Sequence, residues 1–365
     1  MIRGYLNLSK LSDVIIYPFF ECNLSCVGCP AKKPFGGKVG FLKCNPLDFE
    51  RHIDFKHIEK ILTWNVRNFV ILGGEPFLSE AMPMILNDLS SSNRSKVIVY
   101  TNATLLYNRI RENGFRMDEK MHEVLNYIDT LIVSIEGGKD WTDRIRGKGV
   151  YNKASFIIDA LRDVVNIIVR MSYFKYNAIS VLEEVKLLNE LGIKTVLFPR
   201  IGEQPLNTRE TELFYKAIAS FDNADILLPS YKNFLGLNEY GVSCPAGWAK
   251  VCILPDGSIT PCQWNFEVVA HLDWRDRYIE QAFWDWYQKS SRIRTQCLSC
   301  KYAVECRGSC RAAKDYLFCP VRTGGELEDG RIEIFGEVRE ISKKKIVAKM
   351  RKIEGLVLHG CTAAC

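Results

Sequence analysis

The sequence predicts an α/β fold in which a parallel sheet forms a partial (β/α)6 barrel, followed by a small cysteine-rich domain. Three observations support this prediction. Short β-rich apolar runs alternate with helical stretches from about Asp13 to Phe198, as in βα units around a parallel sheet. After Pro229 this periodicity fades, and cysteines become frequent between about Asn238 and Arg322. Because eight βα units close a full barrel, six units predict an open one.

The elements follow from local patterns, strands from short β-rich runs and helices from longer periodic segments. The predicted strands are Val14–Phe19, Phe69–Leu72, Val97–Tyr100, Thr130–Ile135, Ile167–Met171 and Thr195–Phe198. The predicted helices lie near Phe55–Asn65, Ala81–Leu89, Glu119–Tyr127, Lys153–Val164, Val181–Leu191 and Arg209–Ser220. We therefore expect an N-terminal segment (1–12), the barrel (13–236), the cysteine-rich domain (237–325) and a C-terminal extension with a basic stretch and a cysteine-containing tail (326–365).

Composition narrows the class of protein. The chain has 365 residues, of which 47% are hydrophobic and 25% charged, as in soluble folded proteins. Its first residues contain neither a long apolar run nor a signal-peptide pattern, so we expect a cytoplasmic protein with no membrane span. In that compartment the fourteen cysteines favour metal ligation or catalysis over disulfides. The net charge of +6, with seven Lys/Arg between Arg339 and Lys352, favours a solvated helix face over a nucleic-acid patch.

Three cysteines follow the first predicted strand. Cys22, Cys26 and Cys29 have C-x3-C-x2-C spacing, which brings three thiolates together in one loop. Three ligands on a four-iron cluster leave one iron open for a substrate or cofactor. The alternative is a zinc site with a distant fourth ligand.

The second predicted strand runs into Gly73, Gly74 and Glu75. Two glycines at a strand end allow a ligand to approach the backbone closely, and a carboxylate beside them can hold an ammonium group. Because the carboxyl ends of parallel strands share one rim, this turn and the cysteine loop can face the same site.

With these motifs the chain resembles the radical S-adenosylmethionine (SAM) superfamily. Thr101–Leu105, TNATL, is similar to the family's TNGTL-like segment, and Ser134–Gly137 with Thr142–Gly147 looks like its SLDG…HDxxRG segment. The resemblance implies that Cys22, Cys26 and Cys29 bind a [4Fe-4S] cluster and that the GGE-type turn holds the amino group of SAM. The SAM contacts that it implies are Gly73, Gly74, Glu75, Asn102, Ser134, Glu136 and Arg146.

The later cysteines resemble the SPASM extension found on some radical SAM enzymes, which carries two auxiliary [4Fe-4S] clusters. The resemblance assigns Cys244, Cys262 and Cys310 to one cluster, and Cys297, Cys300, Cys306 and Cys319 to the other. Cys252 is either the fourth ligand of the first auxiliary cluster or a small buried apolar residue. An open iron or a thiolate from the tail are further alternatives for that ligand, and a zinc ribbon is the alternative for the whole region.

Three functions stay open at this point. The resemblance implies reductive cleavage of SAM to a 5′-deoxyadenosyl radical, with electrons from a low-potential donor such as ferredoxin or flavodoxin. The first hypothesis is a maturase that oxidises a peptide or protein side chain; the second is a small-molecule enzyme of tetrapyrrole or other cofactor biosynthesis. Only about twenty residues precede Cys22, where many peptide-modifying relatives carry a peptide-binding domain, and this weakens the first hypothesis. The third, from another class, is a zinc-stabilised binding module.

Overall fold

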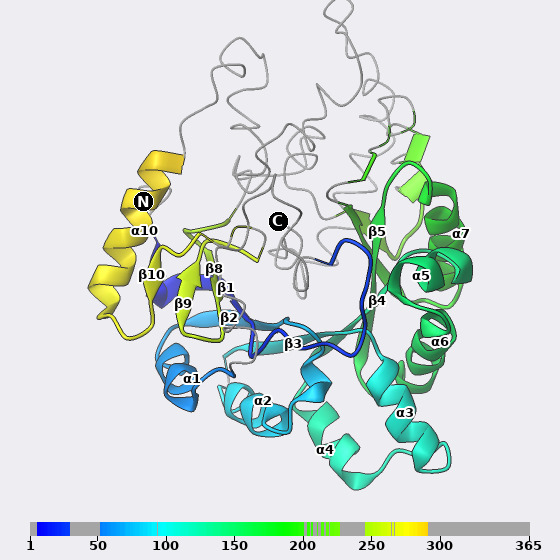
Figure 1. The fold of residues 1–365 in the computed structure, drawn as a ribbon, viewed down its shortest axis with the longest axis horizontal. Coiled ribbons are helices and arrows are strands. Elements are labelled where there is room, and N and C mark those ends of the chain that lie inside the picture. Colours follow the sequence, from blue (N-terminus) through cyan, green and yellow to red (C-terminus); the bar gives the residue numbers. More distant parts are fainter. Residues whose placement is uncertain are drawn as a thin grey trace, which may run out of the picture.

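A curved sheet with helices along its outer side forms the framework of the protein (Figure 1). The computed structural model describes residues 6–29, 52–92, 94–200, 245–263, 265 and 267–290, together with 203, 204, 206, 210, 213, 214, 217, 218 and 220–226. Within these residues ten strands form one sheet in the order β10-β9-β8-β1-β2-β3-β4-β5-β6-β7.

Seven consecutive parallel strands make up most of the sheet, and each pairs with its neighbour in the chain. They are β1 (Leu11–Ile16), β2 (Val66–Ile71), β3 (Lys96–Thr101), β4 (Thr130–Ile135), β5 (Asn166–Tyr173), β6 (Lys194–Pro199) and β7 (Ala224–Ile226). The prediction of an α/β fold with a parallel, open barrel sheet is confirmed, because all six predicted strands are present.

Helices connect the strands and pack on the convex side of the sheet (Figure 1). They are α1 (Phe55–Leu62), α2 (Met82–Ser90), α3 (Thr104–Glu112), α4 (Glu119–Asn126), α5 (Lys139–Arg146), α6 (Val150–Leu161) and α7 (Ala178–Glu190). A single apolar cluster fills the space between helices and sheet, with side chains such as Phe69, Leu86 and Ile157 fully or almost fully buried. Burying this apolar face is what holds the short helices in place.

The first strand begins three residues earlier than predicted, because a charged residue lies inside it. Asp13 is fully buried, and its carboxylate accepts hydrogen bonds from Asn68 Nδ2 at 2.8 Å and from Ser12 Oγ at 2.7 Å. Asp13 pairs in register with Asn68 on β2 and with Lys250 on the other side. Burial raises the pKa of Asp13 to about 6, although its hydrogen bonds and Lys250 oppose the shift.

Part of the cysteine-rich region extends the same sheet beyond β1. Strand β8 (Lys250–Ile253) runs parallel to β1, and β9 (Ser258–Thr260) and β10 (Ala270–His271) follow in antiparallel pairs. Helix α10 (Asp276–Ser290) then packs beside β10 (Figure 1). The predicted domain boundaries stay predictions.

Two predicted segments lie partly or wholly outside the described residues. The predicted helix Arg209–Ser220 is described only at scattered positions, and the whole of 291–365 is outside. Among the described residues, no helix is long and apolar enough to cross a membrane.

Candidate functional site

The carboxyl ends of six parallel strands and the cysteine loop surround one pocket. Its lining includes Cys22, Cys26 and Cys29 after β1, and Gly73 and Gly74 after β2. The later strands add Tyr100, Thr101, Asn102, Ser134, Glu136, Arg146, Arg170, Ser172, Phe198 and Arg200, and Gln263 enters from beyond β9. Motifs that are separated by more than a hundred residues in sequence therefore meet at one rim of the sheet.

The three cysteines are free thiols, partly exposed in this pocket. Polar groups surround them: the Leu24 backbone N–H donates to Cys22 Sγ at 3.4 Å, and Asn102 Nδ2 lies 3.8 Å from the same sulfur. Burial raises the pKa of the Cys26 thiol, while the Arg146 guanidinium opposes the increase. Three soft thiol ligands in one loop, with donors and a cation beside them, fit the ligand set of an iron-sulfur cluster.

The double glycine brings the cysteine loop against the end of β2. A Cβ on Gly74 would lie 1.6 Å from the Glu21 carbonyl oxygen, and one on Gly73 would lie 2.5 Å from that of Phe19. Gly73 also has a φ of +131°, a conformation that favours glycine. Both residues line the pocket, as the sequence suggested, but the atoms that approach them most closely belong to the chain itself.

Glu75 lies beneath the pocket rather than in its lining. Its carboxylate accepts hydrogen bonds from Thr101 Oγ1 at 2.7 Å and from the Asn102 backbone N–H at 2.7 Å. Because the side chain is fully buried, desolvation raises the pKa of Glu75 to about 7, and these hydrogen bonds oppose the shift. Glu75 thus fixes the end of β3.

Asn102 connects that strand end with the cysteine loop. Its Nδ2 donates to Asn23 Oδ1 at 2.9 Å, and its Oδ1 accepts from the Thr104 backbone N–H at 2.9 Å. Asn23 Nδ2 in turn donates to Thr104 Oγ1 at 2.8 Å. This network positions the residues that flank Cys22.

The buried carboxylate of Glu136 lies among three arginines: Arg146 at the end of α5, Arg170 within β5 and Arg200 directly after β6. Glu136 Oε1 lies 2.6 Å from Arg146 Nη2, and Glu136 Oε2 lies 3.7 Å from Arg200 Nη1. Ser172 also donates to Glu136 from its backbone N–H and its hydroxyl. Burial alone raises the pKa of Glu136, but Arg146, Arg200 and Arg170 bring it below its ordinary value. With one ionised carboxylate and three guanidinium groups, this side of the pocket carries an excess of positive charge.

Ser134 and Thr142 complete the β4 end of the site. Ser134 is almost fully buried and lines the pocket. Thr142 Oγ1 accepts from the Glu136 backbone N–H at 2.9 Å and donates to the Gly137 carbonyl at 2.8 Å, and so shapes the turn after β4.

Sequence reasoning missed Arg170, Arg200 and Gln263. An arginine inside the apolar run of β5 was an available signal for Arg170, because a cation in a largely buried strand needs a functional or structural partner. Gln263 directly follows a predicted cluster ligand, Cys262, but no spacing rule points to a lone glutamine.

Of the predicted auxiliary ligands, Cys252 and Cys262 are described, and both are buried. Burial raises the pKa of the Cys252 thiol well above its ordinary range, and the nearby Cys262 adds to the increase. Burial raises the pKa of Tyr17, and the nearby thiols of Cys252, Cys29 and Cys262 add to the increase. The other predicted auxiliary ligands lie outside the described residues: Cys244, Cys297, Cys300, Cys306, Cys310 and Cys319.

Comparison with known proteins identifies the class to which this site belongs. Residues 16–188 match the family model of the Radical SAM superfamily, so this part of the chain is a radical SAM domain, which implies an enzyme. No curated protein matches the chain in sequence.

Two solved proteins share the fold over most of the chain. The structure of anSMEcpe with bound AdoMet and the Cp18Cys peptide superposes with a TM-score of 0.61 at 16% identity, covering 95% of this chain and 100% of that one. Streptococcus suis SuiB bound to S-adenosylmethionine gives a TM-score of 0.58 at 20% identity, covering 83% and 72%. SuiB bound to its precursor peptide SuiA gives 0.60 at 18% identity, again covering 83% and 72%.

Proposed function

We propose that this chain is a radical SAM oxidoreductase that modifies a side chain of a peptide or protein, as a maturase does. The observation that carries the proposal is the pocket in which Cys22, Cys26 and Cys29 meet the Gly73–Gly74 turn and three arginines, Arg146, Arg170 and Arg200. The radical SAM domain match supports the chemistry. The substrate class is drawn from SuiB and anSMEcpe, whose structures contain peptides.

In this proposal the three cysteines hold a [4Fe-4S] cluster with one open iron, beside which SAM binds. When bound, the cluster and SAM supply a 5′-deoxyadenosyl radical that removes a hydrogen atom from the substrate. The chain itself orients these groups and shields the reacting centre from water and oxygen.

Residues on two sides of the pocket are assigned to different groups of SAM. Ser134 and Arg146 are assigned to its carboxylate, since a guanidinium binds that group through paired hydrogen bonds. Gly73 and Gly74, with Glu75 behind them, are assigned to the side of its amino group, and Asn102 and Glu136 to further contacts. An ammonium near Glu75 would favour the ionised form of this carboxyl, whose pKa burial raises to about 7.

The proposal also includes two auxiliary [4Fe-4S] clusters, which would accept an electron from the substrate radical. Their proposed ligands are Cys244, Cys262 and Cys310 for one, with Cys252 as candidate fourth ligand, and Cys297, Cys300, Cys306 and Cys319 for the other. Tyr17 and Cys29 line the pocket, and Cys252 and Cys262 are near enough to Tyr17 to affect its pKa, which supports a first auxiliary cluster near the pocket.

Gln263 favours a peptide as the substrate. The side chain is buried in the pocket lining, and among the described residues neither Nε2 nor Oε1 has a hydrogen-bond partner. Leaving both atoms unpaired is costly, and a peptide group offers one acceptor and one donor to satisfy them. We expect Gln263→Leu to raise the KM for the substrate more than it lowers kcat.

The second candidate is a small-molecule enzyme of tetrapyrrole or cofactor biosynthesis. The excess positive charge of Arg146, Arg170 and Arg200 is the observation that favours it, because such a pocket suits a substrate with several carboxylates.

Anaerobic turnover with SAM and a strong reductant separates the two candidates. The probes are short cysteine-containing peptides encoded beside this gene and, in parallel, a tetrapyrrole precursor with several carboxylates. The proposal expects a peptide to stimulate 5′-deoxyadenosine formation and to lose two hydrogen atoms by mass spectrometry. An unchanged peptide together with an oxidised tetrapyrrole precursor would transfer the assignment to the second candidate.

A further inference from the structure

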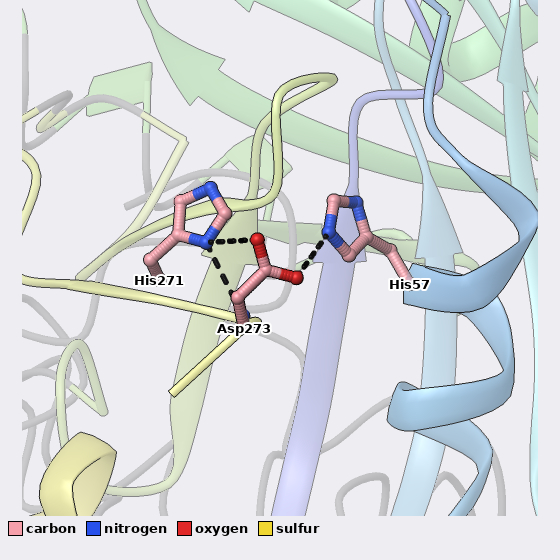
Figure 2. A group of neighbouring side chains, drawn as sticks. All are labelled: His57, His271 and Asp273. Atoms are coloured by element: carbon pink, nitrogen blue, oxygen red, sulfur yellow. Dashed lines mark hydrogen bonds and ion pairs between the residues drawn. The ribbon is translucent and has the colours of Figure 1, made fainter. Parts of the chain in front are cut away.

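Two histidines and an aspartate meet outside the pocket, where α1 faces the turn between β10 and α10. Figure 2 shows His57 on α1, His271 at the end of β10 and Asp273 in the turn. His57 Nε2 lies 3.3 Å from Asp273 Oδ1, and His271 Nδ1 lies 3.4 Å from Asp273 Oδ2. None of the three lines the pocket of the cysteine loop. We propose that they bind one divalent transition-metal ion, foremost Zn²⁺, at a site separate from the cysteine sites.

The distances suit such an ion. With bonds of about 2.0–2.1 Å, two ligand atoms of a tetrahedral zinc site lie about 3.4 Å apart. The two contacts to Asp273 already have this separation, and one ligand atom from each residue lies within 4.8 Å of the others. The His271 and Asp273 side chains are both partly exposed. Their exposure leaves the fourth position to water.

His271 is oriented as a metal ligand. Its Nε2 lies 2.9 Å from the Asp256 carbonyl oxygen, which accepts only from a protonated nitrogen. The ring proton is therefore on Nε2, and the lone pair of Nδ1 accepts a hydrogen bond from the Asp273 backbone N–H at 3.2 Å, which a bound ion would replace. Donation of the second ring nitrogen to a backbone carbonyl is the usual support of a metal-bound histidine.

Packing fixes the second imidazole. The His57 side chain is only 3% exposed, and its ring lies against Gly257, where a Cβ would come within 2.4 Å of Cε1. With a metal on Nε2, the ring proton would lie on Nδ1, which has no hydrogen-bond partner among the described residues.

One cation already competes for the aspartate. Lys56 Nζ lies 3.2 Å from Asp273 Oδ1, and both side chains are more than half exposed. A salt bridge this exposed is weak, so a divalent ion can displace the lysine into solvent. The site would then tie α1 to a turn more than two hundred residues later in the chain, and binding would stabilise the fold by mass action.

The test uses the full-length protein with its clusters assembled, washed with chelator and dialysed against Zn²⁺ alone. Bound zinc and iron are measured for the wild type, His271→Asn, Asp273→Asn and the matched control His122→Ala, which changes an exposed histidine on α4. We expect one zinc ion per chain in the wild type and the control. Zinc affinity should fall at least ~10-fold in the two ligand variants, while iron content stays the same.

Two further measurements keep the assignment falsifiable. X-ray absorption at the zinc edge should show nitrogen and oxygen neighbours at about 2.0–2.1 Å and no sulfur at about 2.3 Å. Lys56→Met should tighten zinc binding, because it removes the competing cation. Zinc content that is equal in the wild type and His271→Asn, or sulfur neighbours around the ion, would overturn the proposal and leave only an ion-pair cluster.

Discussion

Arg146 and Glu136 form a buried ion pair, with 2.6 Å between Nη2 and Oε1, directly beside the cysteine loop. The backbone of the same helix end holds the loop: the Ile145 carbonyl accepts from the Val27 N–H at 2.8 Å, and the Arg146 carbonyl lies 4.0 Å from Cys26 Sγ. The pair therefore links the end of β4, helix α5 and the proposed cluster ligands.

Breaking this pair from one side should destabilise the protein. Arg146→Met leaves the Glu136 carboxylate buried with fewer partners, and we expect a loss of about 3 kcal/mol in the free energy of unfolding. The double variant Glu136→Gln/Arg146→Met should recover part of the loss, because it removes the uncompensated charge. Urea unfolding of both variants measures this.

Arg144→Met is the matched control, since Arg144 is exposed and stacks on Trp141 of the same helix. It should change stability by no more than about 0.5 kcal/mol. Additive losses in the double variant would contradict the pairing of Glu136 with Arg146.

Glu75 should make stability decrease as pH rises. Its pKa is about 7 in the folded protein, compared with 4.5 as the ordinary value, so the folded state binds the proton more tightly. Its contribution to the free energy of unfolding is fully present below pH 4.5 and is lost as pH rises through about 7. The loss amounts to about 3 kcal/mol. In Glu75→Gln this part of the slope between pH 5 and pH 8 should disappear, and urea unfolding across that range measures it. An unchanged slope would mean that Glu75 does not titrate there.

Glu136 should act in the opposite direction. Its pKa in the folded protein is below the ordinary value of 4.5. Its contribution to the free energy of unfolding is therefore present above pH 4.5 and is lost as pH falls through its folded-state pKa.

Gly74→Ala should push the segment after β1, which leads into the cysteine loop, away from the end of β2. The added Cβ would lie 1.6 Å from the Glu21 carbonyl oxygen, so the backbone must shift. We expect a loss of at least ~3 kcal/mol in stability. Iron content after anaerobic reconstitution should fall by about four per chain.

Gly114→Ala serves as its control, because an added Cβ there meets nothing within 4 Å and only the positive φ of +64° is strained. It should cost about 1 kcal/mol and leave iron content unchanged. Full iron loading in Gly74→Ala would show that the cysteine loop tolerates displacement.

Sequence patterns predicted the central sheet well, because its strands are buried apolar runs between helices. Strand β4, Thr130–Ile135, has the predicted bounds, whereas β1 was misplaced because Asp13 is buried in a polar pair that no periodicity reveals. The sequence did not predict helices α3 and α5. Helix α3 begins directly after the turn at Asn102, and α5 buries only Thr142 and Ile145, so neither helix has a long apolar stripe. The strands β7 to β10 are too short to give a pattern.

The predicted site was complete where a local motif defines it and incomplete where single residues contribute. The cysteine loop, the double glycine and the residues after β3 and β4 meet around one pocket, except that Glu75 lies beneath its lining. Arg200 and Gln263 enter from elements far apart in sequence. His57 and His271 were missed for the same reason, since 214 positions separate them. Only the folded chain brings such residues together.

Iron content and SAM cleavage of the triple variant Cys22→Ala/Cys26→Ala/Cys29→Ala test the central claim most directly. Anaerobically reconstituted wild-type protein should contain about twelve irons with matching sulfide, and the variant about four fewer. The wild type should form 5′-deoxyadenosine from SAM with a strong reductant, and the variant should form none. Little iron, stoichiometric zinc at the cysteines and no SAM cleavage in the wild type would contradict radical SAM chemistry and restore the zinc-stabilised binding module.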